Sequence, residues 1–248
     1  MKQRFLFPIL ISLISSVHVS AQSKSIQHLE QTWAGYFNQT RVNKSWGFWF
    51  DGQLRTKENF THQLSQLIIR PGLTYYLNDD AKLTVGYAYV NHFPGDNHKN
   101  ISMPEHRPWF QLQWHNKFES LKLMQWIRFE GRFRHKVLND AQLADGYNVN
   151  FRTRVNLLLQ YPLGKQKFAP GSLSLAAGSE VMVNLGKIIV NNTFDQNRFF
   201  VGFHYHVNKH DFLQFGYMNV FQQLASGNQY KSINTIRINY FHNLNLMR

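Results

Sequence analysis

Arginine and glutamate residues interrupt otherwise apolar stretches of the sequence, often at every second position. These residue types are suited to binding charged groups. An arginine guanidinium forms two parallel hydrogen bonds to a carboxylate, and an arginine without a carboxylate attracts other anions. The set therefore allows two roles, a paired network that fills an interior or a pocket for a small anionic solute. Its members are Arg70, Glu105, Arg107, Arg128, Glu130, Arg132, Arg134, Arg152, Arg154, Glu180, Arg198 and Arg237.

Histidine is the second residue type that could do chemistry. His204 and His206 lie two residues apart and share one face of a strand, a spacing that metal sites use. His92 and His115 could point into the same interior. No third ligand is identifiable, chance pairs are expected among twelve histidines, and hydrogen bonding in the lumen is the favoured explanation of the pair. We therefore assign no metal ion and no other cofactor.

Ser102, Glu105 and His106 supply the residue types of a serine hydrolase within one short segment. Such an enzyme needs a serine nucleophile, a histidine base and an orienting acid. The His-x-Ser-Asn-Gly arrangement of outer-membrane phospholipase does not occur in the sequence. We predict no catalytic residue and keep a lipid-modifying hydrolase as the alternative function.

The elements that must position these residues are β-strands, because hydrophobicity alternates with a two-residue period. In residues 121–135 one parity holds Lys122, Met124, Trp126, Arg128, Glu130, Arg132 and Arg134. The other parity is mostly apolar, and residues 147–161 repeat this design. Successive side chains of a strand point to opposite faces. In a soluble sandwich the apolar face would form the core, whereas in a membrane barrel it faces lipid and the polar face lines the lumen.

Strand length, aromatic placement and loop length favour the membrane barrel. The strands run about ten residues or longer, which suits a tilted crossing of a bilayer. Aromatic residues gather near strand ends, as membrane-interface girdles require. Short connections are expected near Val42–Ser45, Asn78–Asp80, Asn116–Ser120 and Val207–Asp211. Longer ones are expected near Pro94–Pro104, Lys136–Gly146, Leu185–Thr193 and Leu224–Gln229, and Pro162–Pro170 breaks the rhythm. The pattern predicts short periplasmic turns opposite longer external loops.

The predicted fold is an all-β, transmembrane antiparallel barrel of about 12 strands, with 10 as the other possibility. The visible segments are 31–41, 46–57, 62–77, 82–93, 105–116, 121–135, 147–161, 172–184, 195–207, 212–222 and 231–244. These are eleven, and bacterial single-chain barrels usually have an even number. A missed strand is therefore expected near residues 22–30, or one of the segments is not a strand.

The N-terminus predicts export. Residues 1–21 combine Lys2 and Arg4, a short apolar core and a Val19-Ser20-Ala21 end, which is the pattern of a signal peptide. The apolar core is only about ten residues long, too short for a membrane-spanning helix. We therefore expect a mature barrel domain of residues 22–248. No cysteine is present, so neither a disulfide framework nor thiolate chemistry is available.

The charge balance is strongly basic, and it falls from +13 to +11 when the leader is removed. An exported protein does not meet the genome, so nucleic acid is not an expected partner. The expected location is the outer membrane of a Gram-negative bacterium. The expected partners are outer-membrane lipid and lipopolysaccharide, a small anionic solute, and the barrel-insertion machinery during biogenesis.

Five segments in order resemble the motifs of the domain-of-unknown-function family 2490, a group of bacterial proteins predicted to be outer-membrane barrels. They are Gln31-Thr32-Trp33 with Tyr36-Phe37, Leu67-Ile68-Ile69-Arg70-Pro71-Gly72-Leu73, Gly86-Tyr87-Ala88-Tyr89, Glu105-His106-Arg107-Pro108-Trp109 and Phe194-Asp195-Gln196-Asn197-Arg198. The resemblance implies a fold and a location, and no activity.

Overall fold

Every regular element in the described part of the chain, residues 24–95 and 98–247 of a computed structural model, is a β-strand. The predicted signal peptide, residues 1–21, lies outside the described residues. The described residues form no helix long and apolar enough to span a bilayer. The strands are β1 (Ser25–Arg41), β2 (Trp46–Glu58), β3 (His62–Tyr76), β4 (Ala81–His92), β5 (Met103–Lys117), β6 (Lys122–Asn139), β7 (Gln142–Leu163), β8 (Leu173–Leu185), β9 (Phe194–His206), β10 (Asp211–Gln223) and β11 (Gln229–Asn245).

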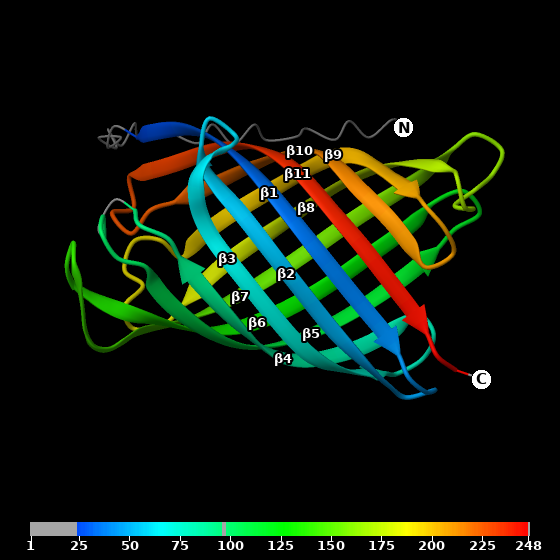
Figure 1. Ribbon diagram of the computed structural model, residues 1–248, viewed down its shortest axis with the longest axis horizontal. Helices are drawn as coiled ribbons and strands as arrows, with labels where there is room; N and C mark the ends of the chain where they lie inside the picture. The colour runs from blue at the N-terminus through cyan, green and yellow to red at the C-terminus, as the bar shows by residue number, and fades with distance from the viewer. Residues whose placement is uncertain (1–23, 96–97, 248) are drawn as a thin grey trace, which may run out of the picture.

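The eleven strands close into one barrel, in which consecutive strands pair with each other and β1 pairs with β11 (Figure 1). The pairs of consecutive strands are antiparallel, and the closing pair of β1 and β11 is parallel. The closing pair is parallel because alternation of direction over an odd number of strands leaves the first and last strands pointing the same way. Its register runs from Ser25 opposite Gln229 to Arg41 opposite Asn245.

The expected count of about 12 strands is wrong for the described residues, which form eleven. The region near residues 22–30 supplies no separate strand, because from Ser25 onward it forms the start of β1. The eleven segments visible in the sequence are all confirmed, with ends that shift by a few residues. The even-number rule fails because a parallel seam closes this barrel.

One predicted loop is also wrong. Residues 136–146 were expected as a long connection, but β6 and β7 extend to leave only residues 140–141 between them. The two strands project as a hairpin beyond the rest of the barrel (Figure 1). Register shifts between His135 and Lys136 and between Val137 and Asn139 accompany this extension, and bulges of this kind bend a strand away from its neighbours.

The connections define two ends of the barrel. The turn end carries residues 42–45, 77–80, 118–121, 164–172 and 207–210. The loop end carries residues 59–61, 93–95, 98–102, 140–141, 186–193 and 224–228. The predicted alternation of short and long connections therefore holds only in part, because each end contains both kinds.

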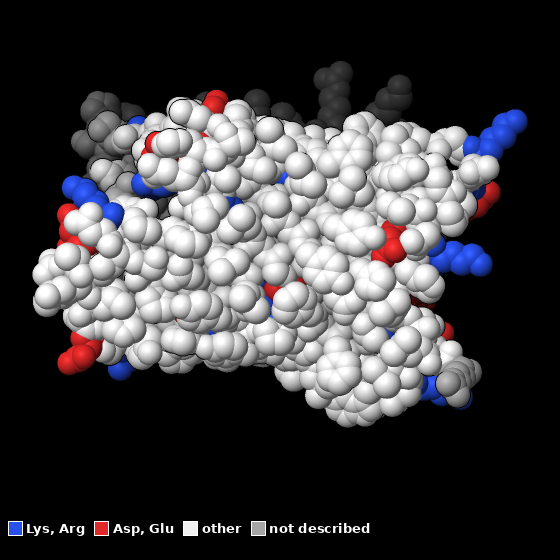
Figure 2. All heavy atoms as spheres, viewed as in Figure 1, with Lys and Arg blue, Asp and Glu red and all other residues white. Residues whose placement is uncertain are grey.

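The barrel is polar inside and apolar outside. The alternation predicted for residues 121–135 and 147–161 is confirmed, since Arg128 and Arg152 are buried whereas Ile127 and Val155 are exposed. Figure 2 shows a broad uncharged band on the visible face, with most Lys, Arg, Asp and Glu side chains at the two ends. The folded protein thus reverses the usual distribution of apolar and polar residues in a globular domain.

Glycine at position 86 makes room for a tryptophan on the inner wall. A Cβ atom on Gly86 would lie 2.8 Å from Cζ2 of Trp109, which is closer than real contacts allow. The indole of Trp109 therefore lies against bare backbone and is 5% exposed. The guanidinium of Arg128 sits 4.5 Å from the centre of the indole ring, a cation–π geometry.

Candidate functional site

The structure places all of the predicted charged residues on the inner face of the barrel. Most are buried, and Arg134, Arg198 and Arg237 are half-buried. They separate into two regions, an ion-paired network in the half of the lumen toward the loop end and the inner wall of a cavity toward the turn end.

Glu105 organises the first part of the network. Its two carboxylate oxygens accept hydrogen bonds from Nε and Nη2 of Arg107 at 2.7 and 2.8 Å. Nε of Arg132 approaches one of the same oxygens at 2.6 Å, and Nε2 of His92 lies 2.7 Å from the other. Glu105 is fully buried, so two guanidinium groups and an imidazole replace its water shell.

Glu130 organises the second part. It accepts hydrogen bonds from Arg152, whose Nη2 lies at 2.7 Å, and from Nη1 of Arg154 at 2.7 Å. Arg152 also donates to Asp195, and Arg154 donates to Glu180, both at 2.7 Å. Positive and negative groups therefore alternate from β9 through β7 and β6 to β8, which holds four strands together across the lumen.

We call these two parts together the lumen network. Its members are His92, Glu105, Arg107, Glu130, Arg132, Arg152, Arg154, Glu180 and Asp195. The side chains of Glu105, Arg107, Arg132 and Arg152 are at most 10% exposed. A water-filled channel along the barrel axis would expose them, so the loop-end half of the lumen is packed.

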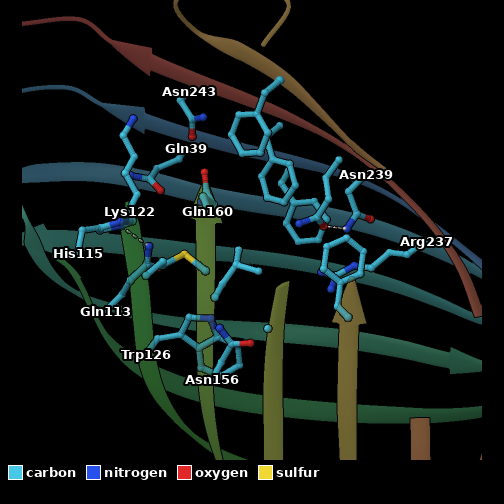
Figure 3. A pocket seen from close by; sticks show the side chains of 18 of the residues that line it. Gln39, Gln113, His115, Lys122, Trp126, Asn156, Gln160, Arg237, Asn239 and Asn243 are labelled. Carbon is cyan, nitrogen blue, oxygen red and sulfur yellow. Dashed lines mark hydrogen bonds between the residues drawn. The ribbon is translucent and has the colours of Figure 1, made fainter. Parts of the chain in front are cut away.

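A cavity of about 670 Å³ occupies the other half of the lumen (Figure 3). Residues of the turn-end connections, such as Phe168 and Lys209, line its mouth, and Trp33 and Arg198 line its inner end. Lys122 and Trp126 lie on the wall opposite Arg237 in Figure 3. The cavity therefore opens at the turn end and is closed toward the lumen network.

Three stacked phenyl rings form one wall of the cavity. The ring centre of Phe241 lies 4.7 Å from that of Phe37 and 4.4 Å from that of Phe212, with interplanar angles of 15° and 6°. The rings come from β11, β1 and β10, which are adjacent strands. Trp49 meets Phe37 edge-on at 6.4 Å. We call Phe37, Phe212 and Phe241 the phenyl wall.

Arg55 and Lys82 line the cavity without an acidic partner, since no described carboxylate lies within 4.0 Å of either. Nη1 and Nη2 of Arg55 donate to Gln66 and Gln53, and its guanidinium lies 3.7 Å from the ring centre of Trp33. Its buried Nε has no partner among the described residues. Lys82 is 5% exposed and contacts the side-chain oxygen of Gln39. Arg55 and Lys82 are thus contacted by neutral glutamine side chains and, for Arg55, by an indole ring.

Arg237 is the third such cation. Nη1 contacts the sulfur of Met218 at 4.0 Å, and the guanidinium lies 5.3 Å from the ring centre of Phe200. The amide of Asn239, in the orientation that presents its oxygen, accepts a hydrogen bond from Nε at 2.8 Å. In the part of the chain that the structure describes, no carboxylate lies within 4.0 Å of Arg237. The guanidinium of Arg237 therefore lies at the inner end of the cavity without a described carboxylate to balance its charge.

The rim carries a cation that is compensated. Nζ of Lys117 lies 2.6 Å from the carboxylate of Asp80. The hydrogen bond from Lys117 lowers the pKa of Asp80, which sits in the exposed connection 77–80. Lys117 is therefore a weaker candidate for a ligand contact than Arg237 or Lys82.

The four histidines considered from the sequence point inward and form hydrogen bonds with neutral groups or, for His92, with Glu105. Nε2 of His204 lies 2.7 Å from Nε2 of Gln214, and Nε2 of His206 lies 3.2 Å from the hydroxyl of Ser174. His115 contacts Gln113 in the same way. Among the described residues, no three His, Cys, Asp or Glu side chains come close enough together to hold a metal ion.

The residues considered for a hydrolase are not assembled. Glu105 points into the lumen, whereas the next residue, His106, points outward among Tyr87, Tyr89 and Tyr147. Adjacent residues of a strand face opposite sides, so Glu105 cannot orient His106. The geometry gives a lipid hydrolase no support.

Sequence reasoning missed several lumen residues. Asp51 and Asp195 are buried carboxylates, and Arg55 and Lys82 are buried cations. Asp51, Gln53 and Arg55 share the inward parity of their strand with Trp49, so the two-residue period could have revealed them. The cavity itself had no sequence signal, because it depends on which side chains meet across the barrel.

Comparison with known proteins places the chain in a family. A family model described as a protein of unknown function, DUF2490, matches residues 30–231. The chain belongs to this family. An uncharacterised protein of Methylorubrum extorquens is similar, with 30% identity over 165 residues that make up 65% of each chain. No solved structure matches. The family's description assigns no activity.

Proposed function

We propose that this protein is an integral outer-membrane β-barrel of a Gram-negative bacterium. The observation that supports the proposal is the apolar outer surface of the barrel, where residues such as Phe48, Phe110 and Val155 are 57%, 50% and 44% exposed. A belt of this size in water would be an association hazard, whereas in a bilayer it meets lipid. The charged rims visible in Figure 2 suit lipid head groups and lipopolysaccharide.

Within that barrel, we propose a solute-binding or carrier role for the turn-end cavity. The packed lumen network argues against a permanently open channel, because ions would have to cross side chains that are almost fully buried. The cavity has the size of a small-molecule site and a cationic lining. If the turn end is periplasmic, the cavity faces the periplasm.

Membrane insertion is tested by arginine substitutions on the outer face at two depths. Val155 and Leu163 both point outward from β7 and have similar exposure, 44% and 39%. Val155 pairs with Ile127 and Val181 in the middle of the sheet, whereas Leu163 ends the strand. In liposomes, Val155→Arg is expected to lower the free energy of unfolding by about 2–4 kcal/mol and Leu163→Arg by about 0–1 kcal/mol.

The measurement is urea unfolding of refolded protein in liposomes, followed by tryptophan fluorescence. A water-exposed surface would tolerate both substitutions equally, because the two side chains are equally accessible. Equal effects, together with a protein that stays monomeric without lipid or detergent, would overturn the proposal.

A further inference from the structure

The cavity has the size and the lining of a site for a small organic molecule. Its volume of about 670 Å³ lies within the range of small-molecule pockets, roughly 300–1,000 Å³. The lining combines aromatic rings with a few charged groups, which is typical of such sites. Its side chains come from strands on all sides of the barrel, so the closed sheet holds them in place.

The charge of the lining selects an anion. The acidic side chains that line the cavity are Glu180 and Asp211, and both already have cationic or imidazole partners, Arg154 for Glu180 and His242 for Asp211. Among the described residues, no carboxylate lies within 4.0 Å of Arg237, Arg55 or Lys82. A cation that is removed from water without a counter-charge is destabilising, and a bound anion offsets this cost.

The phenyl wall favours a ligand whose remaining part, beyond the acidic group, is apolar. Phe241 and Arg237 lie on the same inward face of β11, with Asn239 between them. Four residues of strand span about 13 Å between Cα atoms, which leaves room for a small aromatic or short acyl anion between the two side chains. A hydrated inorganic anion would leave the phenyl wall without contacts, whereas an apolar body would cover it.

We infer that the turn-end cavity binds a small organic anion, with its acidic group at Arg237 and its aromatic or other apolar body against the phenyl wall. The inference deepens the proposed function, since it names the ligand class of the same cavity. The side-chain amides of Asn239 and Gln214, whose nearest polar atoms lie 3.0 Å apart, lie beside the path of the ligand and offer it amide groups.

The test compares three probes by isothermal titration calorimetry with protein in lipid nanodiscs. The probes are 2-naphthoate, the neutral 2-naphthamide and inorganic phosphate. We expect 2-naphthoate to bind at least tenfold more tightly than 2-naphthamide, and phosphate to bind weakly or not at all. Equal binding of the acid and the amide, or tight binding of phosphate, would overturn the inference.

Matched variants locate the site. Arg237→Gln is expected to weaken 2-naphthoate binding at least tenfold and Phe241→Leu several-fold. Arg134→Gln is the control, because Arg134 also has no described carboxylate within 4.0 Å but does not line the cavity. The inference fails if Arg237→Gln and Arg134→Gln bind 2-naphthoate alike while both show the heat-dependent gel mobility of a folded barrel.

Flotation with liposomes separates this result from the proposed membrane location. A protein that floats with lipid but does not bind 2-naphthoate keeps the membrane proposal and loses the anion site. A protein that binds 2-naphthoate in detergent but does not float with lipid keeps the anion site and loses the membrane proposal.

Discussion

Glu130 shows how one carboxylate holds the lumen together. It is 1% exposed and faces Arg152 and Arg154, which lie two residues apart on the neighbouring strand. Each arginine also has a second acidic partner, so the charges form a chain instead of isolated pairs. Removing one member of a buried ion pair lowers the free energy of unfolding by more than the intact pair contributes to it, because the remaining partner stays charged and desolvated.

Glu130→Gln is therefore expected to lower the free energy of unfolding by about 3–5 kcal/mol. The control is Asp140→Asn, which removes a carboxylate whose side chain is 48% exposed and whose contact with Lys99 is 3.8 Å long. That substitution should cost about 0–1 kcal/mol. Guanidinium unfolding in detergent measures both. Similar midpoints for the two variants would show that the network does not stabilise the barrel.

The inward orientation of the charged residues was predictable, and their pairing was not. Alternation along residues 121–135 was enough to put Arg128 and Glu130 on the same face. The contact between Arg152 and Asp195 crosses from β7 to β9 and depends on the register of two strand pairs. Register has no signature in a single strand, because every shift by two residues preserves the same face.

The seam between β1 and β11 is the element that departs from expectation. Strand positions were predictable because apolar and polar residues alternate over long stretches, and turn residues separate them. Eleven segments were visible, which is the observed number, and the expectation of about 12 came from the even-number rule, which is a regularity of known barrels and not a steric requirement. A parallel strand pair also satisfies its backbone hydrogen bonds, and it is only slightly less stable per residue than an antiparallel pair.

An engineered disulfide between β1 and β11 tests this closure. The sequence contains no cysteine, so only the introduced pair can be oxidised. Ala34 lies directly opposite Ile238, and both point outward. Oxidation of the double variant Ala34→Cys, Ile238→Cys should form an intramolecular bond that changes gel mobility after heating until reductant is added.

The control pairs Ala34→Cys with Ile236→Cys, two residues away along β11. Diagonal neighbours lie about 7–8 Å apart, beyond the usual Cα separation of a disulfide. Efficient linking of the control, or no linking of either variant, would mean that β1 and β11 do not pair in this register.

The whole molecule is a barrel that is packed at the loop end and hollow at the turn end. Network side chains fill one half because each buried carboxylate needs cationic partners that reach across the lumen. The other half contains the cavity, whose lining includes the phenyl wall and the cations Arg55, Lys82 and Arg237. The asymmetry gives the barrel one accessible interior surface.

This asymmetry predicts a protein that does not conduct. Refolded protein in a planar lipid bilayer is expected to give no discrete current steps, because the loop-end half has no water-filled path. Insertion would be checked in parallel by liposome flotation and heat-dependent gel mobility. Regular anion-selective steps from inserted protein would show that the network opens, and Arg152→Gln would then be expected to change the step size.

The parallel seam also has a consequence for biogenesis. Ser25 pairs with Gln229, so one edge of β1 can form its hydrogen bonds only after β11 has been synthesised and placed. All other strand pairs form between neighbours in the chain. Closure of so long a loop is entropically costly and slow. Until β11 arrives, β1 exposes an unpaired backbone edge that can aggregate. We therefore expect ring closure to limit the folding rate, and the insertion machinery to be most needed for shielding the nascent edge of β1.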